Sequence, residues 1–203
     1  MRFISFVFAF LLFVFPAINL MAQDTLVFIN GKEVPATNIK INDTQILYNP
    51  LNKPQKLKKA ETYNIFSIKH DTGVETLIYQ QDTLIDDLSL EEMRLFVQGQ
   101  QDALKYFNTT AVTATSTVIG VASGLTLQFF ALVPPAVFAT IVGASSPKME
   151  QQPIQDKSLL QSEAYRSGYE AKARNMKIKK ALIFGIGGAI IGYAGFRVIE
   201  AND

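Results

Sequence analysis

Side chains suited to catalysis or metal binding are few in this sequence, and they form no motif. His70 is the single histidine and cysteine is absent, which excludes disulfides, thiolate catalysis and a lipid-modified N-terminal cysteine. His70 lies in register with apolar positions of an expected strand and beside a turn, which favours a structural or surface role over a catalytic one. We therefore expect no catalytic residue, cofactor or metal site, and we predict that the protein is not an enzyme.

Two groups of charged residues lie in or beside the expected β domain and the helix that follows it. Asp86-Asp87 and Glu91-Glu92 flank the start of an expected helix, where the helix dipole stabilises negative charge. A basic loop and strand start contain Lys53, Lys56, Lys58 and Lys59. Such a run protects a strand edge from aggregation, and contact with anionic lipid or an acidic glycan is the alternative. The net charge of +1 argues against a nucleic-acid partner.

Glycine recurs on one face of an apolar segment, Ala181–Val198, in which Arg197 is the only charged residue. In water each glycine costs a helix roughly 0.5–1 kcal/mol relative to alanine, whereas in lipid it lets two helices pack closely. The segment therefore predicts a transmembrane helix with a packing partner. The helix-packing residues are Gly185, Gly188, Gly192 and Gly195, with Gly120 and Gly124 of an earlier apolar segment as the matching face.

The first two segments are a signal peptide and an exported β domain. Residues 1–22 combine Arg2, an apolar run broken by Pro16 and a cleavage point after Ala22, which is typical of a signal peptide; an uncleaved signal anchor is the alternative. Residues 23–81 show four or five short strands, with a hairpin signal at Asn30-Gly31. Their spacing predicts a small antiparallel barrel or sandwich, with Phe66 and Ile68 on one face of a strand and Ile65 on the other.

Residues 88–144 comprise an amphipathic helix and a first apolar membrane region. Ser89 and Glu92 form a capping box, and Thr110–Val133 is long enough to cross a bilayer. After Pro134-Pro135 only nine apolar residues remain before Ser145. We therefore prefer one span followed by an interfacial or re-entrant piece; a two-span hairpin with a short second arm is the alternative.

The chain continues with a polar linker, 145–161, and a basic helix that leads into the glycine-rich span, 162–203. Basic residues next to a span remain on the cytoplasmic side and attract anionic lipid; the lipid-headgroup candidates are Lys177, Lys179 and Lys180. The predicted topology is an exported β domain, an inward span, a cytoplasmic basic helix and an outward glycine helix. The rule that basic residues remain on the cytoplasmic side does not apply in an outer membrane.

A short pattern occurs twice. Phe96-Val97-Gln98-Gly99 and Tyr165-Arg166-Ser167-Gly168 each precede a Gly-x-x-x-Gly motif by a similar distance. If the pattern is a true repeat, the two apolar helices are packing partners, and the preferred topology makes them an inverted pair.

The sequence also resembles an uncharacterised family of small exported membrane proteins of Bacteroidota. The residues that carry the resemblance are Met21–Asp24, Asn30-Gly31, Gly99–Ala103, Gly168-Tyr169 and the lysine-rich run before Gly187-Gly188. The resemblance implies membrane association and supplies no catalytic residues.

The sequence therefore predicts an α+β membrane protein, in which a β domain precedes amphipathic and glycine-rich transmembrane helices. We expect it in the bacterial cell envelope, with the inner membrane preferred over the outer and the β domain in the periplasm. The expected function is non-enzymatic partner binding by the β domain; a small oligomeric pore or transport accessory is the alternative. Membrane lipid and either a second copy or another membrane protein are the expected partners.

Overall fold

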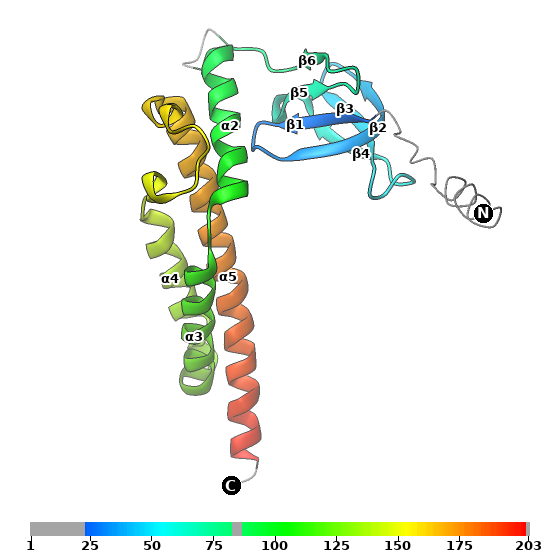
Figure 1. Ribbon diagram of the computed structural model, residues 1–203. Coiled ribbons are helices and arrows are strands. Elements are labelled where there is room, and N and C mark those ends of the chain that lie inside the picture. The colour runs from blue at the N-terminus through cyan, green and yellow to red at the C-terminus, as the bar shows by residue number, and fades with distance from the viewer. Residues whose placement is uncertain (1–22, 83–86, 202–203) are drawn as a thin grey trace, which may run out of the picture.

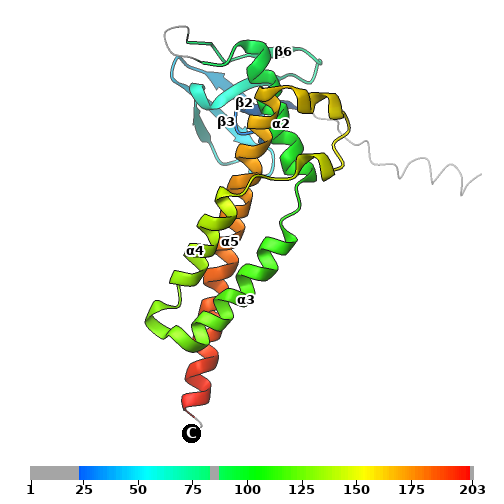
Figure 2. The ribbon, with the colours of Figure 1, turned by 90° about the vertical axis from the view of Figure 1, so that its left-hand side faces the viewer.

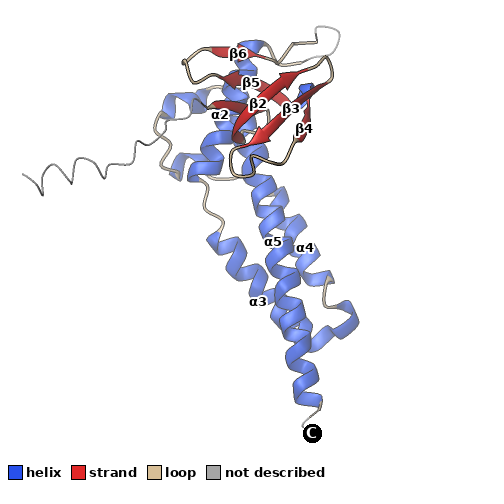
Figure 3. Cartoon of the chain, turned by 90° about the vertical axis from the view of Figure 1, so that its right-hand side faces the viewer, coloured by secondary structure: helices blue, strands red, loops and turns tan. Residues whose placement is uncertain are grey.

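The computed structural model describes residues 23–82 and 87–201. The expected signal peptide, 1–22, lies outside the described residues. The architecture is α+β, with a six-stranded antiparallel sheet followed by helices, and this order is as the sequence predicts. The expected barrel or sandwich is wrong, because the described strands form a single open sheet with β4 and β6 at its edges. Figure 3 shows the strands gathered at one end of the molecule, from which α3, α4 and most of α5 extend.

The sheet is built from consecutive short strands joined by tight turns. Its spatial order is β4-β3-β2-β1-β5-β6, so β1 lies inside the sheet and pairs with β2 and β5. The expected hairpin at Asn30-Gly31 is confirmed, and Gly31 has the positive φ of 76° that glycine adopts without strain. The strands are β1 Asp24–Phe28, β2 Glu33–Ile41, β3 Gln45–Pro50, β4 Lys58–Glu61, β5 Ile65–Lys69 and β6 Glu75–Leu77.

Apolar side chains are buried on both faces of the sheet. Leu26, Ile46, Ile65 and Ile68 belong to one core cluster, and Phe66 belongs to a second cluster on the helix side. The register of β1 against β5 shifts between Val27 and Phe28. This bulge inserts one extra residue into β5 and breaks the alternation of its side chains between the two faces of the sheet. The prediction that Ile65 and Ile68 lie on opposite faces is therefore wrong, because both belong to the same core cluster.

Within the described residues, four α-helices follow the sheet: α2 Leu90–Tyr106, α3 Thr110–Leu127, α4 Val133–Ala144 and α5 Glu163–Glu200. The predicted capping box is confirmed, with the Ser89 backbone N–H donating to Glu92 Oε2 at 2.9 Å. By length and composition, Thr110–Phe130 and Glu163–Glu200 could each cross a membrane, whereas α4 is shorter. The linker contains two 3₁₀ turns, Met149–Gln151 and Lys157–Gln161, and buries Ile154 against α5.

Helix α4 folds back along the bundle, which corrects the expected topology. Pro135 lies beside Gly185, and Gly143 lies beside Ile178 nearer the start of α5, so α4 runs antiparallel to α5. Pro134 and Pro135 occupy the first turn of α4, where a missing N–H costs nothing. The prolines therefore begin a helix that returns alongside α5, as in the hairpin alternative. With 12 residues, α4 is shorter than the two helices that could cross a membrane.

The return of α4 also reverses the expected relation between the two glycine helices. Figures 1 and 2 show α2 and then α3 running alongside α5 in the same direction. Helix α4, which lies between α3 and α5 in the sequence, runs in the opposite direction. The inverted-pair prediction is wrong because α3 and α5 are parallel. The basic first half of α5 consequently lies at the same end of the bundle as the β domain.

The direction of α4 can be tested by disulfide crosslinking, since the chain has no native cysteine. We expect a Gly143→Cys, Ile178→Cys double variant to crosslink rapidly within one chain under mild oxidation, because these positions are in contact. A Gly143→Cys, Tyr193→Cys pair, with its second cysteine farther along α5, should not crosslink. Crosslinking of the control pair alone would contradict the antiparallel arrangement.

Candidate functional site: the glycine interface and the β-domain docking interface

The α3 and α5 helices meet backbone to backbone at glycines, and we call this contact, together with its extension along α2, the glycine interface. A Cβ added at Gly120 would lie 2.9 Å from the Ala189 backbone nitrogen and closer still to the Gly185 carbonyl oxygen. No side chain fits in that space. The same close approach occurs from the other helix, where Gly188 faces Thr117 and Gly192 faces Val121.

The remaining predicted packing residues differ in how tightly they are enclosed. Gly124 lies against the backbone of Ala189 and Tyr193, and Gly185 lies between Pro135 of α4 and Ser116 of α3. Gly195 makes only ordinary contact with Leu125, at 3.6 Å from an added Cβ. The structure thus brings five of the six glycines into close contact within one chain. These contacts supply no argument for assembly with a second chain.

The interface continues beyond the apolar helices through the two repeated motifs. A Cβ at Gly99 of α2 would lie 2.9 Å from the Tyr169 nitrogen, and one at Gly168 of α5 would lie 2.8 Å from the Phe96 carbonyl carbon. Each motif therefore places its glycine against the backbone of the other. The sequence shows the repeated pattern but predicts no function for Gly99. The aromatic-x-x-Gly pattern that Phe96–Gly99 shares with Tyr165–Gly168 is the feature that indicates its packing role.

Two buried serine hydroxyls donate to backbone carbonyls inside the bundle. Ser116 Oγ donates to the carbonyl oxygen of Ala181, and Ser123 Oγ donates to that of Ala131 at 2.7 Å. The second bond ties α3 to the turn before α4. Each of these two serine hydroxyls therefore joins two segments rather than lining a polar path.

The docking interface between the β domain and the helices is formed by the β1–β2 turn. Gln100 of α2 donates to the Ile29 carbonyl oxygen at 3.2 Å, and Lys172 of α5 donates to the Asn30 carbonyl oxygen at 2.5 Å. A Cβ at Gly31 would lie 2.7 Å from Gln100 Cβ. The turn thus inserts against both helices, and only glycine fits at its tip.

Apolar contacts complete this interface on the adjoining face of α2. Met93 and Val97 are buried against Val27 and Phe66 of the sheet. One turn further along, Asp102 accepts a hydrogen bond from the Tyr165 hydroxyl at 2.7 Å. Helix α2 is therefore packed by the sheet on one face and by α5 on another.

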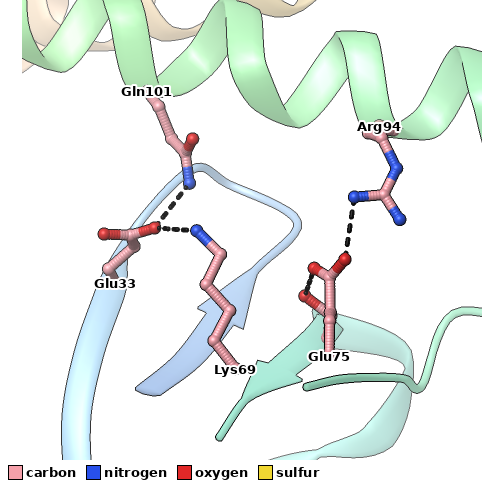
Figure 4. Close-up of polar contacts among 6 residues, drawn as sticks. Glu33, Lys69, Glu75, Arg94 and Gln101 are labelled. Atoms are coloured by element: carbon pink, nitrogen blue, oxygen red, sulfur yellow. Dashed lines mark hydrogen bonds and ion pairs between the residues drawn. The ribbon is translucent and has the colours of Figure 1, made fainter. Parts of the chain in front are cut away.

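Two polar clusters reinforce the docking interface (Figure 4). Glu33 accepts from Lys69 Nζ at 2.8 Å and from Gln101 Nε2 at 3.1 Å. Glu75 accepts from Arg94 at 2.8 Å and from Ser67 at 2.6 Å. Burial alone would raise the pKa of Glu75, but the hydrogen bonds from Ser67 and Arg94 and the nearby positive charges lower it below its usual value.

The three predicted lipid-headgroup lysines differ in exposure. Lys177 is 5% exposed, and its ammonium donates to the carbonyl oxygen of Ser145 and to Ser145 Oγ. Ser145 ends α4, where helix carbonyls lack intrahelical partners. Burial therefore excludes the predicted headgroup role of Lys177 and gives it a helix-capping role instead. Lys179 and Lys180 are exposed, and their role stays a prediction.

His70 has the partners of a catalytic histidine but an open setting. Its Nδ1 lies 3.1 Å from Asp24 Oδ2, and its Nε2 lies 2.9 Å from Thr76 Oγ1. Thr76 is exposed on β6, and the His70 side chain is about one-third exposed. Nucleophilic catalysis uses oriented oxyanion donors in a water-excluded site. The arrangement is that of a surface cluster joining β1 to the β5–β6 hairpin.

Comparisons with protein-family models, curated proteins and solved structures return no match to this chain. The resemblance to a Bacteroidota family therefore stays a prediction.

The glycine interface predicts a sharp difference in stability between substitutions at Gly120 of α3 and at Gly187 of α5. Gly120→Ala should destabilise the bundle by at least the 1–3 kcal/mol or so typical of overpacking, because its Cβ would meet backbone atoms. Gly187→Ala is the matched control, since an added Cβ there has no neighbour within 4 Å. Thermal unfolding in detergent, followed by circular dichroism, measures both. Equal loss in the two variants would contradict the interface.

The lowered pKa of Glu75 predicts an acid-sensitive docking interface. A carboxyl group whose pKa is lower in the folded state stabilises the fold above its unfolded pKa, and this stabilisation is lost as pH falls through the folded pKa. Stability to urea should therefore fall below about pH 4.5, and less steeply in Glu75→Gln. Glu61→Gln, in the same sheet, is the control and should follow the unmodified protein. An unchanged acid profile in Glu75→Gln would refute the assignment.

Proposed function

We propose that the protein is a non-enzymatic membrane-anchored scaffold of the bacterial cell envelope, in which α3, α4 and α5 are embedded in lipid and the β domain is held at one face. The exposed apolar surface of these helices carries the proposal. Phe129 is 96% exposed, and large exposed apolar side chains lie on all three helices and in the turn before α4: Val118, Leu132, Val137, Ile141, Ile186, Ile190 and Ile191. An apolar surface of this extent indicates a membrane or protein contact.

The distribution of charge favours lipid over a soluble partner. Residues 107–147 and 181–196 contain no charged side chain, and the buried polar groups of the bundle face inward. The polar groups therefore lie inside the bundle, where they form hydrogen bonds, and the outer surface is apolar. A lipid environment requires this arrangement, because it offers no water to hydrogen-bond exposed polar groups.

The helix lengths fit a thin bilayer core. Helix α3 has 18 residues, or about 27 Å at 1.5 Å per residue, and the uncharged part of α5 is about 24 Å long. Leu125 contacts Gly195, so the α3–α4 turn reaches the last turns of α5. Exposed Phe129 and Phe130 lie in the turn between α3 and α4, at the far end of the proposed span.

In this proposal one side of the membrane holds the β domain, the linker and the basic half of α5. The end of α5 lies on the other side. The expected export signal assigns the first side to the periplasm, whereas the positive-inside rule assigns it to the cytoplasm. We favour the periplasm, because the first hydrophobic segment usually dominates orientation.

The β domain is the part available to bind a partner or envelope component. Its attachment to α2 and α5 through the β1–β2 turn would present it in a fixed orientation. A pore is the less favoured function, because backbone contacts such as Gly120 against Gly185 fill the interface between α3 and α5. A conducting path would have to lie between several copies.

Sidedness is tested with single cysteines and a membrane-impermeant maleimide. We expect Thr72→Cys, in a turn of the β domain, and Ser158→Cys, in the linker, to label from the same side. Ala201→Cys, at the end of α5, should label from the other side. Opposite labelling of Thr72→Cys and Ser158→Cys would refute the proposed arrangement. Release of the protein from membranes by alkaline carbonate would refute membrane embedding.

A further inference from the structure

The connection between β3 and β4, together with the first two residues of β4, combines positive charge with exposed leucines. We call residues 51–59 the Lys loop. Every residue in it is exposed, and Leu57 is 61% exposed. Between Asn49 and Ala60 there is no acidic residue to balance the four lysines. Among the described residues 23–82 and 87–201, none of these ammonium groups forms an ion pair. The charge is therefore free to act on an external partner.

The Lys loop has a defined shape. Asn49 Nδ2 donates to the Pro54 carbonyl oxygen at 2.9 Å, and two successive turns are closed by Lys53 N–H to Pro50 and Lys56 N–H to Lys53. Leu51 N–H donates to the Pro35 carbonyl oxygen at 3.0 Å. Because the loop is already ordered, binding through it costs little conformational entropy.

The position of the Lys loop follows from strand register. Pro50 pairs with Ala36 at one end of β3, and Ile46 pairs with Ile41 at the other. The loop therefore leaves the end of the sheet opposite the β2–β3 turn at Asn42–Thr44. In Figures 1 and 2 it is the lowest part of the β domain and points toward the level at which α3 begins.

Other lysines extend this basic surface to the apolar helices. A groove joins Lys58 and Leu51 of the loop to Lys32 of the β1–β2 turn. Glu33 also lines this groove, but its carboxylate is engaged by Lys69. Lys32 and Lys179 both lie close enough to act electrostatically on Lys172, and exposed Lys179 and Lys180 immediately precede Ala181. Positive charge thus runs from the loop to the start of the uncharged segment.

We propose that the Lys loop docks on the anionic lipid headgroups of the bilayer that holds α3, α4 and α5, with Leu57 entering the headgroup layer. This inference rests on the membrane placement proposed above. Lysines interspersed with exposed leucines are suited to an anionic membrane surface, which offers both charge and apolar depth. An acidic glycan would use the lysines but leave Leu57 in water. The β domain would then contact the membrane both through its helices and through this loop.

The experiment uses the full chain in vesicles, with an environment-sensitive fluorophore on single cysteines. In vesicles containing phosphatidylglycerol, Leu57→Cys should show blue-shifted emission and quenching by lipid-borne quenchers. In phosphatidylcholine vesicles or at 1 M salt both effects should be largely lost, because screening shortens the Debye length to about 3 Å. Asp43→Cys, in the exposed β2–β3 turn at the opposite sheet end, should stay in a polar environment in all samples.

Two further variants separate the possible failures. Ile190→Cys, on the exposed surface of α5, should be blue-shifted in both kinds of vesicle; if it is not, the membrane proposal fails. If Ile190→Cys is shifted but Leu57→Cys matches Asp43→Cys in phosphatidylglycerol, only the loop proposal fails. Replacing Lys53, Lys56, Lys58 and Lys59 by glutamine should abolish the Leu57→Cys shift. A shift retained in that variant, or produced by a soluble acidic polysaccharide without vesicles, would also overturn lipid docking.

Discussion

The close approach of two helix backbones is the constraint on which the rest of the structure depends. Helices α2 and α3 run along α5 with glycines in close backbone contact along their length, from Gly99 and Gly168 to Gly120 and Gly192. Such contacts gain from dense packing and from weak Cα–H···O bonds. They exclude side chains from the interface, and a single added methyl group would separate the helices. Glycine here lowers intrinsic helix stability but permits the contact that stabilises the pair.

The glycine interface also determines where the β domain can lie. Helix α2 gives one face to α5 and the adjoining face to Phe66 and Val27 of the sheet. The β1–β2 turn reaches past α2 to Lys172 of α5. Apolar burial supplies most of the attachment, since the polar groups that reinforce it are partly exposed and ion pairs in such positions contribute little. The sheet and the helix pair therefore form one connected unit.

The parallel arrangement of α3 and α5 requires a return segment, and α4 provides it. Pro134 and Pro135 start α4 without loss of hydrogen bonds, and Lys177 satisfies carbonyl and hydroxyl oxygens of Ser145 at its end. Both ends of this short helix are thus stabilised locally. In the membrane arrangement we propose, this return segment is what brings the basic half of α5 to the side of the β domain and the Lys loop.

Local rules of sequence determined much of this protein without reference to tertiary contacts. The Asn30-Gly31 hairpin, the Ser89–Glu92 capping box, the order of sheet before helices and the glycine face of Ala181–Val198 each follow from residues close together in the chain. Tertiary structure decided the direction of α4, the face on which Phe66 lies, the burial of Lys177 and the purpose of Gly99. A proline pair, a bulge, a lysine and a mid-helix glycine each allow several conformations or environments locally. The contacts that select one of them come from strands or helices distant in the sequence, so their outcome is not encoded in any short pattern.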